Sequence, residues 1–119
     1  GHMRTLIKAD ILKEFLNVLD SFERARDFFE KLPEEHRKGL ENMYNQLKQI
    51  FQKHGVEEIA GIGEKFDPGL HEALMQVPTK TPNEAEKVLD IFEKGYIIKD
   101  LVLRPAKVKI GKPENAAEE

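Results

Sequence analysis

The sequence predicts an α+β protein in which a helical hairpin pairs with that of a second copy to form a dimeric four-helix bundle, followed by a small C-terminal β domain. Apolar residues recur with helical spacing as far as His54, and glycine and proline punctuate the chain from Gly55 onward. The last apolar stretch alternates with a period of two. With 119 residues, 39% hydrophobic and 34% charged, the chain suits long solvent-facing helices, and we expect an elongated or oligomeric protein.

The first predicted helix runs from Arg4 to Lys31. Its apolar residues form one broad face, and the segment contains no glycine or proline. Part of this face approaches a heptad seam, which needs a second helical surface to cover it. The preceding residues 1–3 resemble a tag-cleavage remnant, so His2 is left out of functional arguments.

A second helix is predicted after Pro33, because Glu34 and Glu35 are acids suited to a helix N-terminus and Gly55 is placed as its C-terminal stop. Two helices alone bury too little apolar surface, so we expect a homodimer whose two hairpins make a four-helix bundle. The expected dimer core comprises Leu12, Phe15, Leu19, Phe22, Leu40, Leu47, Ile50 and Phe51.

The region after the helices is predicted to contain short strands. Val102, Arg104, Ala106, Val108 and Ile110 are expected to share one face of the last strand, with Pro105 at a free edge or bulge and Lys99-Asp100 forming a hairpin turn. Expected strands are Val56–Ile59, Glu72–Val77, Lys87–Phe92, Tyr96–Lys99 and Leu101–Ile110. The expected organisation is a helical region at 4–55, a β domain at 56–111 and a disordered tail at 112–119.

Composition argues against several classes of function. A net charge of −3 without a dense basic run does not predict nucleic-acid binding, and no apolar run has the length of a membrane span. The absence of cysteine agrees with a reducing cytosol, and we expect a cytoplasmic protein. Ser21 is the only serine and lies among apolar neighbours, so a hydrolytic triad is not expected. No cofactor is expected either.

Residues 64–74 read EKFDPGLHEAL and hold the one candidate for chemistry, since Asp67, His71 and Glu72 lie close in sequence. The favoured interpretation is structural: Asp67 and Pro68 build a turn, Phe66 fills the core, and His71 is a hydrogen-bonding tie. The alternative is a small metal-dependent enzyme, for which the spacing of ligands is poor.

A local excess of basic residues marks the C-terminal part. Residues 94–112 contain one acid, Asp100, and either solubility or an acidic partner surface explains the bias. The basic residues are Lys94, Lys99, Arg104, Lys107, Lys109 and Lys112.

Three stretches, FLNVLDSFERA, FDPGLHEAL and KGYIIKDLVLRPAKVKI, resemble elements of one family, GrpE, the nucleotide exchange factors of DnaK-type heat-shock chaperones. FLNVLDSFERA (residues 15–25) is similar to the family's LLPVLDNLERA, and FDPGLHEAL (66–74) is similar to FDPNLHEAV. KGYIIKDLVLRPAKVKI (94–110) is similar to KGYTLNGRVLRPAMVVV, and the order and spacing agree. The resemblance implies a parallel dimer of long helices beginning upstream of this chain, a four-helix bundle and a β wing on each protomer.

The resemblance also implies a co-chaperone rather than an enzyme. In the family, one β wing presses on the chaperone's ATPase domain and favours an open cleft from which ADP leaves. Family contacts align with Phe92, Leu101, Arg104 and Ile110. Because Leu101 stands where many members carry arginine, Lys99 is an alternative contact. Asn17 likewise replaces a proline that is usual in the helix.

On this interpretation the junction that attaches the wing to the bundle is formed by Phe66, Asp67, Pro68 and His71. A generic helical dimerisation module remains the alternative.

Overall fold

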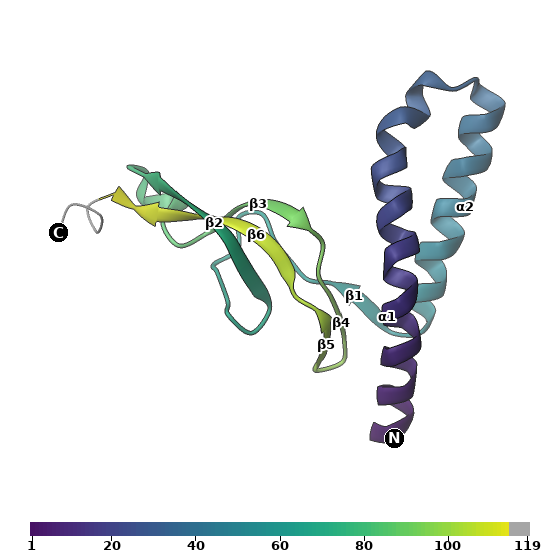
Figure 1. Cartoon of the computed structure of the whole chain (residues 1–119), viewed down its shortest axis with the longest axis horizontal. Coiled ribbons are helices and arrows are strands. Elements are labelled where there is room, and N and C mark those ends of the chain that lie inside the picture. The colour runs from purple at the N-terminus through teal and green to yellow at the C-terminus, as the bar shows by residue number, and fades with distance from the viewer. Residues whose placement is uncertain (115–119) are drawn as a thin grey trace. The chain divides into compact units, whose positions relative to one another are not determined.

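The computed structural model describes residues 1–114, which divide into two units, Gly1–Glu57 and a second unit that begins at Glu58 (Figure 1). The α+β class is confirmed, because two helices precede two small sheets. The elements are α1 (His2–Ala25), the 3-10 helix η1 (Arg26–Lys31), α2 (Glu34–Lys53), β1 (Val56–Glu58), β2 (His71–Thr79), the 3-10 helix η2 (Pro82–Glu84), β3 (Val88–Glu93), β4 (Tyr96–Ile98), β5 (Leu101–Arg104) and β6 (Ala106–Pro113).

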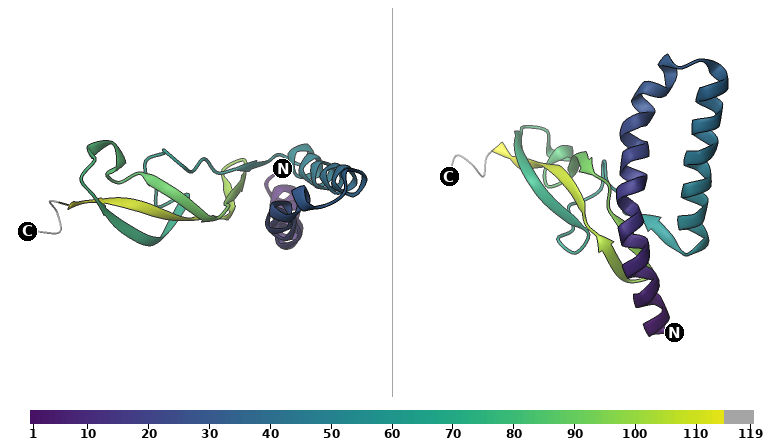
Figure 2. Two further views of the ribbon diagram at one scale, coloured as in Figure 1. Left: turned by 90° about the horizontal axis from the view of Figure 1, so that it is seen from above. Right: turned by 45° about the vertical axis from the view of Figure 1, so that its right-hand side comes forward.

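The helical unit is a hairpin in which α1 and α2 run side by side (Figure 2). The first helix ends at Ala25, and the remainder of the expected helix, to Lys31, is wound as a tighter 3-10 helix. Pro33 occupies the position just before α2, whose first turn carries Glu34 and Glu35. Gly55, with φ 84°, occupies the left-handed conformation that ends this helix, as its position in the sequence predicted. Within residues 1–114, neither helix has the length and apolarity that crossing a membrane requires.

Helix α1 presents two apolar faces. One face is buried inside the hairpin with Tyr44 and Phe51 of α2, and consists of Ala9, Leu12, Leu16 and Leu19. The other face remains at the surface of the single chain and consists of Met3, Ile7, Ile11, Phe15 and Val18. Of the residues expected in a dimer core, Leu12, Leu19 and Phe51 are already buried in the single chain. Phe22, Leu40 and Leu47 are partly buried, and Phe15 and Ile50 are exposed.

Tyr44, halfway along α2, joins this helix to the end of α1. Its hydroxyl donates to a carboxylate oxygen of Glu23, and the Arg26 guanidinium lies 4.4 Å from the ring centroid. Arg26 also lies 3.8 Å from the Glu41 carboxylate, so this polar cluster ties the end of α1 to α2. Because Tyr44 is buried, the cluster fixes the pairing of the helices at the point where α1 tightens into η1.

Two three-stranded sheets follow the helices, ordered β1-β4-β5 and β2-β6-β3. In the second sheet, β6 is central and pairs in parallel with β2 and antiparallel with β3. Ile59, Val88, Ala106, Val108 and Ile110 form the buried cluster, against which Phe66, Leu70, Ala73, Ile91, Ile97 and Val102 pack. Burial of these apolar side chains is the main stabilising term for so small a unit.

Pro105 divides the strand that was expected over Leu101–Ile110. It lies between β5 and β6, where its missing N–H removes no hydrogen bond from a ladder. The expected single alternation is wrong, because Leu103 rather than Arg104 is buried in β5 and burial resumes at Ala106. The expected hairpin turn at Lys99-Asp100 is confirmed, since Ile98 pairs with Leu101 across it.

The end of β6 includes residues that were expected in the disordered tail. Lys112 and Pro113 are the last residues of this strand and pair with Pro78 and Thr79 of β2. Residues 115–119 of that expected tail lie outside the described part of the chain.

Candidate protein-binding site

Four backbone and side-chain hydrogen bonds build the turn at Asp67–His71. Asp67 Oδ1 accepts from the Gly69 N–H at 2.8 Å, and the Asp67 carbonyl accepts from the N–H groups of Leu70 and His71. The Asp67 N–H in turn donates to His71 Nδ1 at 2.9 Å. Pro68 fits such a turn because its φ is fixed by the ring.

His71 is buried, with 5% of its surface exposed, and both of its ring nitrogens are bonded. Since Nδ1 accepts from Asp67, Nε2 is the protonated nitrogen, and it donates to the Ala60 carbonyl at 2.9 Å. The imidazole stacks on Phe66 with the ring centroids 5.9 Å apart. His71 therefore ties the turn to the segment that follows β1, and both bonds lie within the second unit.

The structure does not support a metal site at this turn. Within residues 1–114 no three histidine, aspartate or glutamate side chains gather in an arrangement that holds a metal ion. Both ring nitrogens of His71 are engaged with backbone, and Glu72 is exposed, next to a buried residue in a strand whose side chains alternate in direction. Asp67 and His71 meet as the turn interpretation predicted, whereas Glu72 does not join them.

Phe92 is the exposed aromatic residue of the β unit. It lies in β3 and is 48% exposed, whereas its neighbour Ile91 pairs with Val108 and packs against the buried cluster. When a protein partner covers an exposed aromatic ring on a strand, burial of the ring contributes strongly to the binding free energy.

Two further candidates lie on the β4–β5 hairpin. Lys99 is exposed at its turn with φ 54°, and Leu101 is partly buried at the start of β5. These two residues present a charge and an apolar side chain from the same hairpin. Neither side chain belongs to the buried cluster or to the residues that pack against it.

Arg104 and Ile110, which the sequence also suggested as contacts, lie in different surroundings. The Arg104 side chain is only 13% exposed and is engaged with Glu93 and the Lys94 carbonyl. Ile110 is 8% exposed and belongs to the buried cluster, so we place it in the core rather than on a binding surface.

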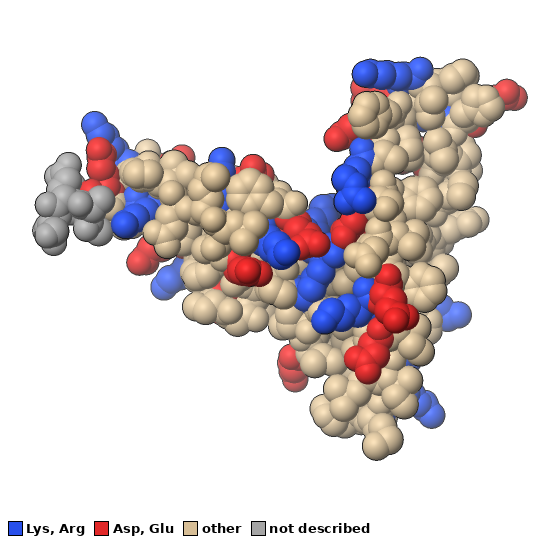
Figure 3. Space-filling view, viewed as in Figure 1, with Lys and Arg blue, Asp and Glu red and all other residues tan. Residues whose placement is uncertain are grey.

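The basic excess at 94–112 is partly neutralised inside the unit. Lys94 lies 3.5 Å from the Glu58 carboxylate, and Arg104 and Lys107 both pair with Glu93. Figure 3 shows acidic and basic side chains interspersed over the visible face of the β unit. This arrangement favours solubility and internal pairing over a continuous basic surface for an acidic partner.

Leu74 and Met75 are exposed apolar residues of β2 that sequence reasoning did not single out. Pairing with β6 is irregular between Ala73 and Met75, and this bulge leaves both adjacent side chains at the surface. The signal was present in the sequence, because two adjacent large apolar residues cannot both face the core of a regular strand.

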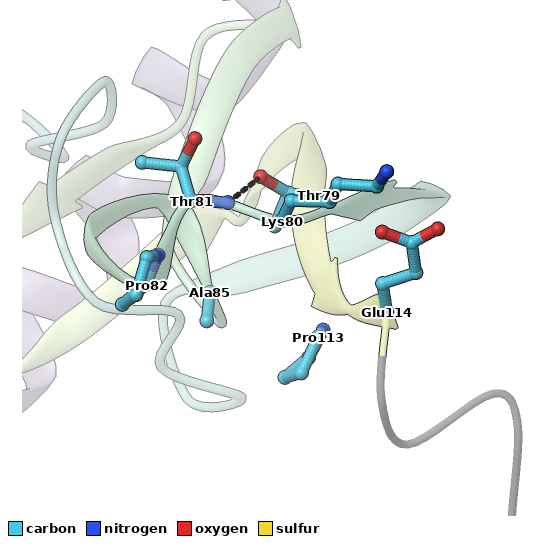
Figure 4. Close-up of a pocket in the computed structure, with 7 residues that line it drawn as sticks. All are labelled: Thr79, Lys80, Thr81, Pro82, Ala85, Pro113 and Glu114. Atoms are coloured by element: carbon cyan, nitrogen blue, oxygen red, sulfur yellow. Dashed lines mark hydrogen bonds between the residues drawn. The ribbon is translucent and has the colours of Figure 1, made fainter.

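A hollow of about 580 Å³ lies where η2 meets the ends of β2 and β6 (Figure 4). Its lining mixes polar and apolar side chains, and the Thr81 N–H donates to Thr79 Oγ1 at 3.1 Å. Thr79 Oγ1 donates in turn to Glu84 at 2.9 Å. None of the candidate contacts lines this hollow, and we assign it no function; its lining is Thr79, Lys80, Thr81, Pro82, Ala85, Pro113 and Glu114.

Comparison with known proteins gives a consistent result over both units. The protein-family model described as GrpE matches residues 3–112. A protein named Protein GrpE in Lactiplantibacillus plantarum is 39% identical over 110 residues, which cover 88% of this chain and 55% of the relative. Relatives of the same name in Alkaliphilus oremlandii and Caldanaerobacter subterraneus subsp. tengcongensis are each 42% identical, over 86% of this chain and 54% and 49% of their own lengths. The chain thus spans about half the length of the curated relatives it matches.

Proposed function

The chain belongs to the GrpE family, and on that premise we propose that it is an adenyl-nucleotide exchange factor that binds the ATPase domain of a DnaK-type chaperone. The observation that carries the proposal is the family match, which covers residues 3–112 and so includes both the helical hairpin and most of the β unit. This role is that of a co-chaperone in protein folding and the stress response. It requires partner binding and no catalytic group of its own.

Exchange follows from differential affinity. A protein that binds the open form of a nucleotide cleft more tightly than the closed form shifts the chaperone toward the open form. Contacts to ADP are lost in that form, and ADP leaves. By linkage, nucleotide and exchange factor weaken each other's binding by the same factor, so rebinding of nucleotide releases the exchange factor.

We place the binding surface on exposed residues of the β unit: Phe92 on β3, and Lys99 and Leu101 on the β4–β5 hairpin. Phe92 supplies exposed aromatic area, and Lys99 supplies a charge at the tip of a tight turn. Leu101 makes this contact apolar where many family members place an arginine. A charge-assisted bond at that position is thereby replaced by burial of a leucine.

We further propose a homodimer, with the exposed face of α1 as its core. Met3, Ile7, Ile11, Phe15 and Val18 recur every three or four residues, which is the spacing of one helix face. Ile50 of α2 is also exposed. A second copy covers such a face in a four-helix bundle without any change in the hairpin itself.

The rate of ADP release tests the proposal. A DnaK-type ATPase domain is loaded with a fluorescent ADP analogue, chased with excess unlabelled nucleotide, and mixed with increasing amounts of the chain. We expect the release rate to rise with concentration and to saturate. A rate equal to that of buffer at every concentration, together with no binding by calorimetry, would refute the exchange function.

A generic dimerisation module is the second candidate, and the two apolar faces of α1 are the observation in its favour. The same titration separates the two. A chain that dimerises but neither binds the ATPase domain nor speeds release has only the dimerisation role.

A further inference from the structure

The chain passes between the two sheets of the β unit at two places that touch each other. Residues 94–95 link β3 to β4, and Pro105 links β5 to β6. A Cβ atom built on Gly95 would lie 2.3 Å from the Ala106 nitrogen and 2.7 Å from the Pro105 carbonyl carbon. The two backbones are therefore in direct contact, and only glycine fits at this crossing.

Arg104 bridges these two crossings with its side chain. Its Nε–H donates to the Lys94 carbonyl at 2.8 Å, and Nη1 lies 3.1 Å from Glu93 Oε1. The guanidinium also lies 5.5 Å from the ring centroid of Tyr96, the residue that pairs with Arg104 across the hairpin. These three contacts reach residues 93–96, so one side chain at the end of β5 holds the link between β3 and β4.

Glu93 extends this bridge to the central strand of the other sheet. Its second oxygen, Oε2, lies 3.2 Å from Lys107 Nζ on β6. Arg104, Glu93 and Lys107 thus form a chain of charges from β5 through β3 to β6. A planar guanidinium that is largely removed from water binds such partners with fixed geometry, which a lysine does not reproduce.

We infer that Arg104 is a positioning residue that locks the β4–β5 hairpin onto the β2-β6-β3 sheet. Its effect on the chaperone partner rests on the proposed function: by fixing the hairpin, it presents Lys99 and Leu101 in one orientation. The guanidinium acts on the partner through the hairpin and makes no contact of its own. This assignment differs from the direct contact that the resemblance implied.

Amide exchange in the free chain tests the lock without any partner. Arg104→Met retains the length of the side chain and removes the charge and the donors. The matched control is Lys107→Met, which also deprives Glu93 of an ion pair but leaves both crossings bridged. We expect hairpin amides of β4 and β5 to exchange at least about tenfold faster in Arg104→Met and less than about twofold faster in the control. Equal protection in Arg104→Met and the unaltered chain would overturn the inference.

A double-mutant cycle on chaperone affinity tests the consequence. We expect Arg104→Met and Glu93→Gln each to weaken binding, and the double variant to bind no worse than Arg104→Met alone, because the two residues act as a unit. A direct contact predicts the opposite: Glu93→Gln would leave affinity unchanged or raise it, and that result would overturn the positioning role. If the unaltered chain fails to bind any DnaK-type ATPase domain, the proposed function fails. The amide-exchange experiment on the free chain still tests whether Arg104 holds the β4–β5 hairpin in place.

Discussion

His71 Nε2 donates to the carbonyl oxygen of Ala60 at 2.9 Å, and this bond connects two segments of the β unit that are separated by a long loop. The same ring accepts the N–H of Asp67 at 2.9 Å. A buried imidazole with both nitrogens satisfied by backbone contributes to stability and has no nitrogen left for a chemical step.

Loss of this ring is expected to destabilise the β unit. His71→Ala removes two hydrogen bonds and the packing against Phe66, and leaves the Ala60 carbonyl and the Asp67 N–H without their partner. We expect the free energy of unfolding to fall by about 2–4 kcal/mol. Urea denaturation measures it, with exposed Glu72→Ala as the control expected to change stability by less than about 0.5 kcal/mol. If the two variants were equally stable, the proposed stabilising role of the His71 hydrogen bonds would be wrong.

The Asp67 side chain is expected to matter as an acceptor rather than as a charge. Asp67→Asn keeps an oxygen for the Gly69 N–H, whereas Asp67→Ala leaves that donor unpaired in the turn. We expect the alanine variant to lose about 1 kcal/mol and the asparagine variant to stay close to the unaltered chain. Thermal unfolding of both variants checks this, and an asparagine variant as unstable as the alanine variant would show that charge is required.

Glu86 is expected to be a site where a substitution stabilises the protein. Its φ of 59° lies in the left-handed region. In this region a residue with a Cβ atom is strained, whereas glycine is not. We expect Glu86→Gly to raise the free energy of unfolding by about 0.5–1 kcal/mol, because the relief exceeds the added entropy of the unfolded chain. The neighbouring Lys87→Gly, which has no such strain to relieve, should destabilise. A destabilised Glu86→Gly variant would contradict the strain argument.

The proposed homodimer depends on the exposed face of α1. Phe15 is 50% exposed in the single chain, so Phe15→Asp should leave the hairpin intact and raise the dimer dissociation constant by at least about tenfold. Sedimentation equilibrium over a dilution series measures this, and circular dichroism confirms that the helices persist. Lys13→Asp, an exposed polar position on the same helix, is the control. An unaltered chain that sediments as a monomer at every concentration would refute the dimer.

Phe92 is expected to contribute to chaperone binding. Phe92→Ala removes an exposed ring that packs outside the buried cluster, so stability should change little while the dissociation constant for the ATPase domain rises about tenfold. Phe28→Ala is the matched control, because Phe28 is an exposed phenylalanine of the helical unit. Equal affinities of the two variants would remove Phe92 from the proposed surface.

Much of the fold was predictable because its signals are local. Helical spacing, Pro33 and Gly55 predicted the hairpin, and the Asp67–His71 turn followed from the turn chemistry of aspartate, proline and glycine. The two faces of α1 were not separable, since periodicity does not say which apolar residues meet the chain's own second helix. The burial of Ile110 was equally hidden, because it depends on how β6 pairs with strands distant in sequence. The surroundings of Arg104 were hidden because its contacts with Glu93 and the Lys94 carbonyl depend on how the two sheets are joined.

The order of strands in the second sheet also sets when it can form during synthesis. Its central strand, β6, is the last of the described strands to leave the ribosome, and β2 and β3 pair with β6 rather than with each other. The helical hairpin, whose contacts are closer in sequence, can form while the β unit is still incomplete. Until β6 emerges, β2 and β3 are nascent segments with apolar side chains and unpaired edges, so this sheet can close only after residues 106–113 have left the ribosome.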